Sequence, residues 1–370
     1  MRRSHMRILF TASLLSLAGA LCAEELAVHT SDAKPIAATD QQRWAAFPII
    51  ASSPETGQML GGMLFYFFPV DELGKQASTI DTMIYGTTKG QYGVQVSPNI
   101  FFDAGRYRLN AMLSRSIWQA NYYGIGMDSP DAAEKYKSSN LQGVLTLERR
   151  FGDDFVLDIM GLYDSNDITV QQGGMLETER VPGYDDGTYN GLGFEGGYDT
   201  RDNTNSPTEG VVVRYRYAKY ASGLGSDLEF NLQNWDVRHY RKTEWMKDSV
   251  LALAATVRRT NGEVPFRYLS SPDGTLILRG IENGRYRDRD MLALQSEWRF
   301  PIHGRFSATA FAEAAQVAPR LGEMTAGRFV TSLGAGIRYA LNPDQRFNVR
   351  GDLAWVDHGV GMIIYVREAF

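Results

Sequence analysis

Most of the chain alternates apolar and polar residues with a period of two. Between residues 329 and 341, one face carries Leu333, Ile337 and Tyr339, and the opposite face carries small or polar residues and Arg338. A period of two places alternate side chains on opposite faces of a β-strand. One face must therefore meet lipid or a packed core, while the charged face must meet water.

Similar segments recur from residue 43 to the end of the chain, separated by turn signals. A soluble sandwich also alternates, but its strands are typically about five or six residues long. These segments are longer, about 10 to 14 residues, and about sixteen of them fit the even strand number of bacterial membrane barrels. We therefore predict an all-β fold, a transmembrane antiparallel β-barrel over residues 44–370. The expected strands are 44–51, 58–68, 78–87, 91–102, 107–118, 136–151, 155–170, 188–199, 211–220, 228–241, 248–260, 291–300, 306–317, 329–341, 347–356 and 360–370.

The connections between these strands alternate in length. Outer-membrane barrels have short periplasmic turns and longer outer loops. With the last residue on the periplasmic side, the short turns at 103–105, 152–154 and 302–304 all fall inside, and the long loops at 122–133, 171–187 and 261–289 all fall outside. The pattern indicates a protein of the bacterial outer membrane.

The N-terminal region has the features of a secretory signal peptide over residues 1–23, with a basic start and an apolar core at 8–17. The core is too short for a membrane anchor, and lipidation of Cys22 is a weaker alternative because the preceding residues match that signal poorly. Residues 24–43 are polar and patternless, which predicts a flexible periplasmic lead. Cys22 is the only cysteine, so cleavage after Ala23 leaves no disulfide chemistry.

Composition excludes two other classes. Hydrophobic residues make up 44% of the chain and the mean hydropathy is −0.28. No apolar run after residue 23 reaches the roughly 20 residues that a transmembrane helix needs. The net charge of −5 argues against nucleic acid as a partner, because such proteins carry a basic surface.

Two stretches resemble motifs of the bacterial surface-antigen superfamily of outer-membrane barrels, which includes the BamA and TamA insertases and the two-partner secretion transporters. Residues 278–281, Leu-Arg-Gly-Ile, are similar to the loop-tip motif of that family. Residues 197–203, followed by Pro207 and Gly210, are similar to its strand-turn signature. Residues 53–57 and 350–354 add weaker matches. The lead is too short for the periplasmic POTRA domains of the insertases, which suggests a POTRA-less member.

The resemblance implies a loop lock and a function. Arg279 and Gly280 would form the tip of an outer loop folded into the lumen, and Arg279 would pair with Glu313 two residues after Phe311. The pair either gates the lumen or only stabilises the barrel. The implied role is insertion or translocation of polypeptide or lipid at the outer membrane, with outer-membrane lipid and the barrel assembly machinery as partners. The alternative is a passive channel or structural barrel.

Two further sets of residues are candidates for local roles. Asp199, Arg201 and Asp202 flank a periplasmic turn, where Asp side chains bond neighbouring backbone groups, so we favour a structural role. Pro48, Gly361 and Phe370 lie on the first and last strands and suggest a weak lateral seam. Proline cannot donate a hydrogen bond to a neighbouring strand. The alternative is that Pro48 only marks the start of its strand.

The sequence gives no sign of an enzyme. It has no serine in an elbow motif, no His or Cys cluster with metal spacing and no phosphate loop, so we expect no catalytic residue, cofactor or metal. A barrel lipase built on His239 and Ser249 remains a third hypothesis without a recognised motif.

Overall fold

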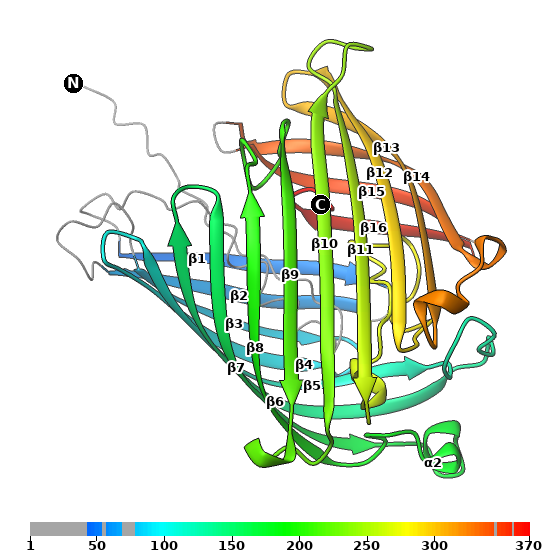
Figure 1. The fold of residues 1–370 in the computed structure, drawn as a ribbon. Coiled ribbons are helices and arrows are strands. Elements are labelled where there is room, and N and C mark those ends of the chain that lie inside the picture. The colour runs from blue at the N-terminus through cyan, green and yellow to red at the C-terminus, as the bar shows by residue number, and fades with distance from the viewer. Residues whose placement is uncertain (1–42, 54–56, 69–77, 344–345, 357–358) are drawn as a thin grey trace.

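Sixteen antiparallel strands form the protein, joined in chain order into one curved sheet (Figure 1). The computed structural model describes residues 43–53, 57–68, 78–343, 346–356 and 359–370. The expected signal peptide and all but the last residue of the expected lead lie outside these ranges. The predicted all-β barrel fold is confirmed.

The strand bounds are close to those that the alternation predicts. The strands are β1 (Trp44–Ser53), β2 (Gly57–Phe68), β3 (Ser78–Thr87), β4 (Tyr92–Phe102), β5 (Tyr107–Tyr122), β6 (Glu134–Phe151), β7 (Phe155–Thr169), β8 (Gly187–Asp199), β9 (Gly210–Tyr220), β10 (Phe230–Lys242), β11 (Val250–Gly262), β12 (Asp290–His303), β13 (Phe306–Ala318), β14 (Val330–Asn342), β15 (Phe347–Val356) and β16 (Gly359–Val366). The helical segments are α2 (Met175–Glu179), η2 (Ser222–Leu224), η3 (Phe266–Tyr268), η4 (Leu321–Glu323) and η5 (Ala326–Arg328). None of the described helices has the length and apolar content to cross a bilayer.

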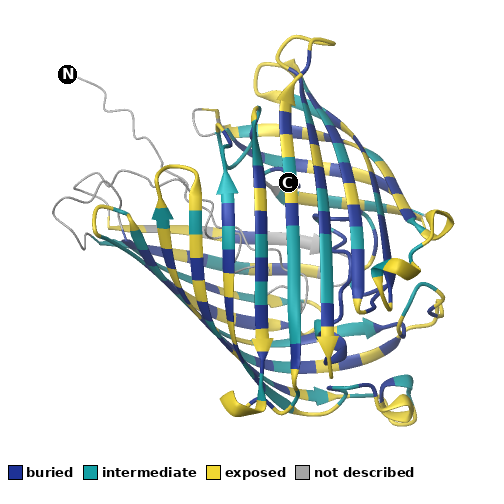
Figure 2. Ribbon diagram, in the orientation of Figure 1, coloured by how far each residue is buried: buried dark blue, intermediate teal, exposed yellow. Residues whose placement is uncertain are grey.

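The two faces of the sheet differ in burial, which appears as alternating bands along each strand (Figure 2). On β12, Leu294 is exposed on the outer face, whereas Gln295 and Glu297 are buried on the inner face. Exposed apolar residues on the outside suit contact with acyl chains, and polar residues on the inside suit an enclosed polar lumen.

The barrel has two distinct ends. At the end we call the turn end, β6 joins β7 through residues 152–154 and β12 joins β13 through residues 304–305; at the other, the loop end, the longer connections lie. The last strand differs from the prediction: β16 stops at Val366, the N–H of Arg367 makes one more hydrogen bond to Asn348 of β15, and residues 368–370 are buried inside the barrel.

The sheet has two edges, β1 and β16. These strands approach each other at a few positions, but no hydrogen-bonded register joins them among the residues that the structure describes. The other neighbouring strands are all paired, for example β7 along its whole length with β6. The line between β1 and β16 is therefore the weakest line in the wall, and we call it the seam.

The β11–β12 connection, residues 263–289, folds back into the lumen. Most of the backbone hydrogen bonds of this loop join residues within the loop itself. Many of its side chains are buried, including Phe266, Leu278 and Arg279. The protein core therefore lies inside the barrel, between this inserted loop and the inner wall.

Candidate functional site in the barrel lumen

The tip of the inserted loop is shaped by local hydrogen bonds. The Asp273 carboxylate accepts from the backbone N–H groups of Thr275 and Leu276, both at 2.7 Å. Short polar side chains of this kind commonly cap tight turns. Gly280 follows with a φ of +91°, a conformation that glycine adopts without a steric penalty. The turn points Arg279 towards the inner faces of β12 to β15.

Arg279 is fully buried and bonds carboxylates from three different strands. Its Nε donates to Glu313 Oε1 at 2.7 Å, and its backbone N–H donates to Glu313 Oε2 at 2.6 Å. Its Nη1 donates to Glu297 at 2.6 Å and to Asp352 at 3.2 Å. The expected Arg279–Glu313 pair is present. Glu297 and Asp352 are additional partners.

Two other contacts orient the same arginine. The guanidinium carbon lies 3.4 Å from the centre of the Phe311 ring, a distance at which a cation is attracted by an aromatic face. The hydroxyl of Ser332 donates to the carbonyl oxygen of Arg279 at 2.6 Å. Side chain, N–H and carbonyl of one residue are therefore all bound to the wall.

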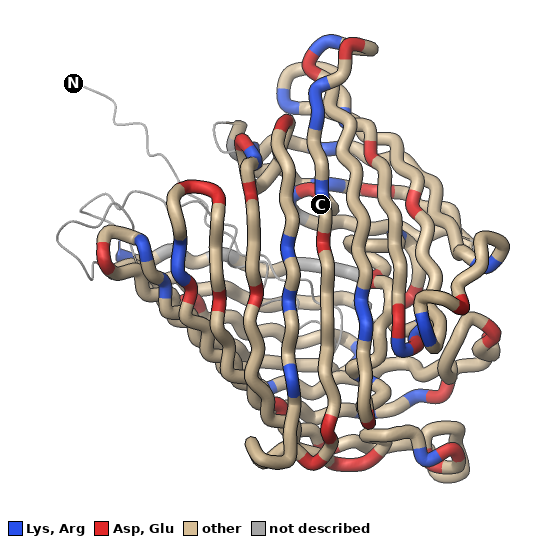
Figure 3. Tube along the Cα trace, viewed as in Figure 1, with Lys and Arg blue, Asp and Glu red and all other residues tan. Residues whose placement is uncertain are grey.

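The Arg279 contacts belong to a larger set that we call the charge cluster, in which each side chain is at most 8% exposed. Ion pairs connect its members across β12 to β15, the loop and the chain end; Figure 3 shows basic and acidic positions interspersed along these strands. Four arginines face four carboxylates, so the formal charges cancel. The members are Arg279, Arg299, Arg338, Arg350, Glu297, Glu313, Asp352 and Glu368.

Glycines on the inner wall leave space for this cluster. A Cβ at Gly361 on β16 would lie 2.5 Å from the Cα of Gly280, so the loop tip rests directly on the last strand. A Cβ at Gly334 would overlap the Phe311 ring, and one at Gly336 would overlap Asp352. Gly361 thus has a clear packing role, which the sequence analysis did not foresee when it assigned this glycine to the seam.

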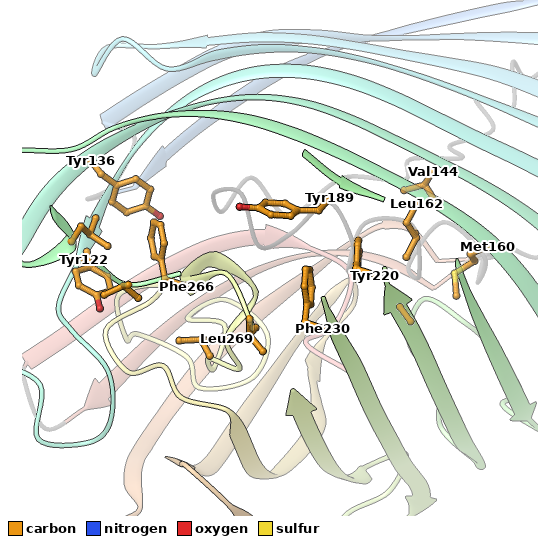
Figure 4. Packing of buried hydrophobic residues seen from close by; sticks show 14 of the residues in the cluster. Tyr122, Tyr136, Val144, Met160, Leu162, Tyr189, Tyr220, Phe230, Phe266 and Leu269 are labelled. Carbon is orange, nitrogen blue, oxygen red and sulfur yellow. The ribbon is translucent and has the colours of Figure 1, made fainter. Parts of the chain in front are cut away.

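The base of the inserted loop is held differently, by aromatic packing at the loop end. Phe266 lies beside Tyr122 and Tyr136, with ring centres 5.4 and 5.1 Å away (Figure 4). Tyr268 contacts the rings of Tyr220 and Phe230 at 5.4 and 5.1 Å. These rings come from β5, β6, β9 and β10, so the base of the loop packs against the half of the wall opposite the charge cluster.

The predicted turn motif organises the β8–β9 connection. Arg201 Nε donates to both oxygens of Asp199, at 2.9 and 3.1 Å. Asp202 accepts from the backbone and side chain of Thr208 at 2.8 and 2.7 Å, and from Arg346 on the β14–β15 turn at 2.5 Å. Burial would raise the pKa of Asp202, but hydrogen bonds from Thr208, Arg346 and Glu209 lower it to about 2.

The three seam candidates lie in different places. Pro48 is in the middle of β1, opposite Gly62 of β2, and not at the strand start. Gly361 is on β16 against the loop tip. Phe370 is not on the seam at all: its side chain is buried inside the barrel with residues of β9, β10 and β11. Whether Pro48 and Gly361 weaken the seam stays a prediction.

A comparison with protein families decides the classification. The model of the Omp85 superfamily domain matches residues 77–356. The chain belongs to the Omp85 superfamily. This Omp85 member is a bacterial outer-membrane protein, a barrel of the insertion and translocation type, so its turn end is periplasmic and its loop end faces outward. No curated protein matches the chain.

Solved structures show the same fold at low sequence identity. BamA from Haemophilus ducreyi lacking POTRA domains 1–3 is similar with a TM-score of 0.64 at 14% identity, covering 88% of this chain and 69% of that one. CdiB from Escherichia coli gives a TM-score of 0.61 at 10% identity, with 89% and 63% covered. CdiB from Acinetobacter baumannii gives 0.55 at 11%, with 87% and 60% covered. The chain spans less than two thirds of either CdiB.

Proposed function

We propose that this Omp85 barrel inserts or translocates a polypeptide at the outer membrane, and that the polypeptide engages the edges of β1 and β16. The observation that carries the proposal is the pair of unpaired strand edges beside a lumen occupied by the inserted loop. The edge of a strand presents free N–H and C=O groups that an extended polypeptide can pair with.

The membrane makes it energetically favourable for these edges to pair with another strand. Within the hydrocarbon region, each unsatisfied backbone group costs several kcal/mol, because no water replaces the missing hydrogen bond. A passing strand that pairs with β1 or β16 lowers that cost. A lipid cargo, which the sequence analysis also allowed, offers no row of donors and acceptors, so the unpaired edges favour a polypeptide.

In this function the inserted loop and the surrounding partners have supporting roles. The inserted loop would close the lumen, so that exchange takes place at the seam. The remaining partners would be outer-membrane lipid around the wall and the assembly machinery that inserts the barrel itself. Such a role needs no covalent chemistry, and we propose that the protein is not an enzyme.

A photo-crosslinking amino acid at the seam tests the proposal. Met362 points outward on the edge strand β16, and Leu294 points outward on β12, which is paired on both sides; they are 65% and 47% exposed. Leu294 is therefore the matched control. Irradiation of intact cells should capture polypeptides at position 362 and few at position 294. Equal capture at both positions, or none at 362, would contradict the proposal.

A further inference from the structure

The outer surface of β5, β6 and β7 extends beyond the membrane at the loop end. These neighbouring strands have 16, 18 and 15 residues and are the longest of the described strands (Figure 1). About 9–11 residues take a tilted strand across a bilayer. Exposed apolar side chains such as Leu145 and Ile159 cover the part nearer the turn end. The remaining part, towards the loop end, therefore lies at the height of the outer lipid headgroups.

Tyr163 marks the outer edge of the apolar surface. It is 39% exposed on β7 and lies in one row with Gly143 of β6 and Leu113 of β5. Tyrosine is enriched where a barrel wall passes from acyl chains to water. Side chains beyond this row therefore meet headgroups and not acyl chains. On the outer face of β6 and β7 they become polar, with Ser139, Ser165, Asp167 and Thr169.

Two lysines project outward in this headgroup region. Lys135 and Lys137 are exposed on β6, whereas Glu134, Tyr136 and Ser138, which alternate with them, are buried on the inner face. Within the described part of the chain, neither lysine makes an ion pair. Their ammonium groups are therefore available to an anion outside the barrel.

Arg115 supplies a third positive charge, on β5 at the lower edge of the same region. Its side chain is 51% exposed, and its Nη2 donates to the hydroxyl of Ser139 at 2.8 Å. Arg115 is opposite Leu141 of β6, four residues along the strand from Lys137. At the rise of a β-strand this places the two charges roughly 13 Å apart. We call Arg115, Lys135 and Lys137 the basic patch.

Neighbouring carboxylates neutralise the basic patch only in part. Asp167 is 66% exposed and 3.9 Å from Arg115, and an exposed pair of this kind is weak. Glu282 of the inserted loop already accepts from Asn121 and Tyr123, at 2.5 and 2.7 Å. The outer surface at this height thus keeps an excess of positive charge directly above an apolar wall.

A lipid with phosphate groups matches this arrangement. Arginine and lysine both bind phosphate, and basic clusters at a membrane surface bind anionic headgroups. Acyl chains would lie on the apolar wall below Tyr163. Because Arg115 and Lys137 are well separated, a headgroup with two phosphates fits better than a phospholipid with one. The side chains of Gln119 and Thr169, next to Lys137 in its row, suit the hydroxyl groups of a sugar.

We propose that the basic patch is a binding site for a phosphorylated glycolipid of the outer leaflet, with one phosphate at Arg115 and the other at Lys135 and Lys137. The site is on the outer wall, away from the seam and from the inserted loop tip. It depends only on the position of the barrel in the outer membrane, so it stands or falls separately from the proposed function.

Native mass spectrometry of the full chain in detergent tests the site, with lipid A that carries two phosphates as the probe. The pair Lys135→Gln and Lys137→Gln should weaken binding about 25-fold, since each basic residue beside a charged lipid surface contributes roughly a fivefold gain. Lys219→Gln is the matched control, because Lys219 is a single exposed lysine on β9, and should leave the affinity unchanged. Unchanged binding by the double variant, or equal weakening by Lys219→Gln, would overturn the proposal.

Further arms separate charge from folding and one ligand from another. The pair Lys135→Arg and Lys137→Arg keeps both charges and should bind as the wild type does; a loss equal to that of the glutamine pair would overturn the proposal. Phosphatidylglycerol, with one phosphate, should bind at least tenfold more weakly than lipid A. Equal affinity for the two lipids, or displacement of lipid A by millimolar inorganic phosphate, would contradict a glycolipid site.

Discussion

The inserted loop is fixed at two places by two different kinds of contact. Its tip, at Arg279, is held by ion pairs and hydrogen bonds to β12, β13 and β15. Its base, at Phe266 and Tyr268, is held by aromatic packing against β5, β6, β9 and β10. The same loop thus meets charged side chains on one half of the inner wall and aromatic rings on the other.

The two kinds of contact tolerate change differently. Buried ion pairs are directional, and removing one partner leaves an uncompensated charge that costs about 3–5 kcal/mol. Apolar contacts scale with area, so a smaller ring or an aliphatic replacement loses only part of the stabilisation. The tip should therefore respond to substitution abruptly and the base gradually.

Removal of the tip charge should have the largest effect. Arg279→Ala leaves Glu313, Glu297 and Asp352 without their shared cation, and should lower the free energy of unfolding by about 4 kcal/mol. The urea midpoint in detergent, followed by tryptophan fluorescence, measures this. Arg320→Ala is the control, because Arg320 is exposed and its Glu323 partner is 4.0 Å away, and should change stability by less than about 0.5 kcal/mol. Equal shifts for both would contradict a special role for the tip.

Truncation at the base should come next. Phe266→Ala should lower the free energy of unfolding by about 3 kcal/mol, because a fully buried ring is replaced by a cavity. Phe266→Leu keeps much of the volume and should lose only about 1 kcal/mol, chiefly the edge contacts with Tyr122 and Tyr136. The same urea titration separates the two variants. If Phe266→Leu lowers the free energy of unfolding as much as Phe266→Ala, the buried apolar area is not what stabilises the base of the loop.

A steric change at the tip should have a smaller effect. Gly361→Ala places a Cβ 2.5 Å from the Cα of Gly280, so the loop tip must shift, at a loss of about 1–3 kcal/mol. Gly351→Ala on β15 is the matched control, since a Cβ there meets nothing within 4 Å. Indistinguishable urea midpoints for the two variants would mean that the tip does not rest on β16.

The sequence predicted the strands well, but it predicted few of the side-chain contacts inside the barrel. The alternation of apolar and charged residues predicted all sixteen strands, because a wall between lipid and a polar lumen requires a period of two. It could not place Glu297 and Asp352 around Arg279, since period two assigns a face but not which residues of distant strands lie at the same height.

Two features escaped prediction for physical reasons. Phe266 and Tyr268 lie in a loop without a periodic pattern, so their burial depends on where that loop folds. Phe370 ends a segment whose alternation fits a strand, but the contacts of Glu368 and Phe370 inside the barrel outweigh that local preference. The Arg279–Glu313 pair, by contrast, was predicted from the family resemblance.

Loss of the Asp202 carboxylate, on the β8–β9 turn, should have the smallest effect on stability. The folded-state pKa of Asp202, about 2, is below its ordinary value of 3.8, so the stability that its carboxylate contributes is present above about pH 4 and is lost as the pH falls towards 2. Because Asp202 is partly exposed, the contribution should not exceed about 1 kcal/mol. Urea midpoints between pH 5 and pH 2.5 should fall less for Asp202→Asn than for the wild type. Parallel curves would contradict a role for this carboxylate.

Single-channel conductance in planar bilayers tests most directly whether the charge cluster holds the loop inside the lumen. The wild-type barrel should give closed or briefly flickering traces, and Arg279→Ala should give a larger and longer-lived conductance as the tip is released. A large, steady conductance of the wild type, or an unchanged trace for Arg279→Ala, would contradict the account.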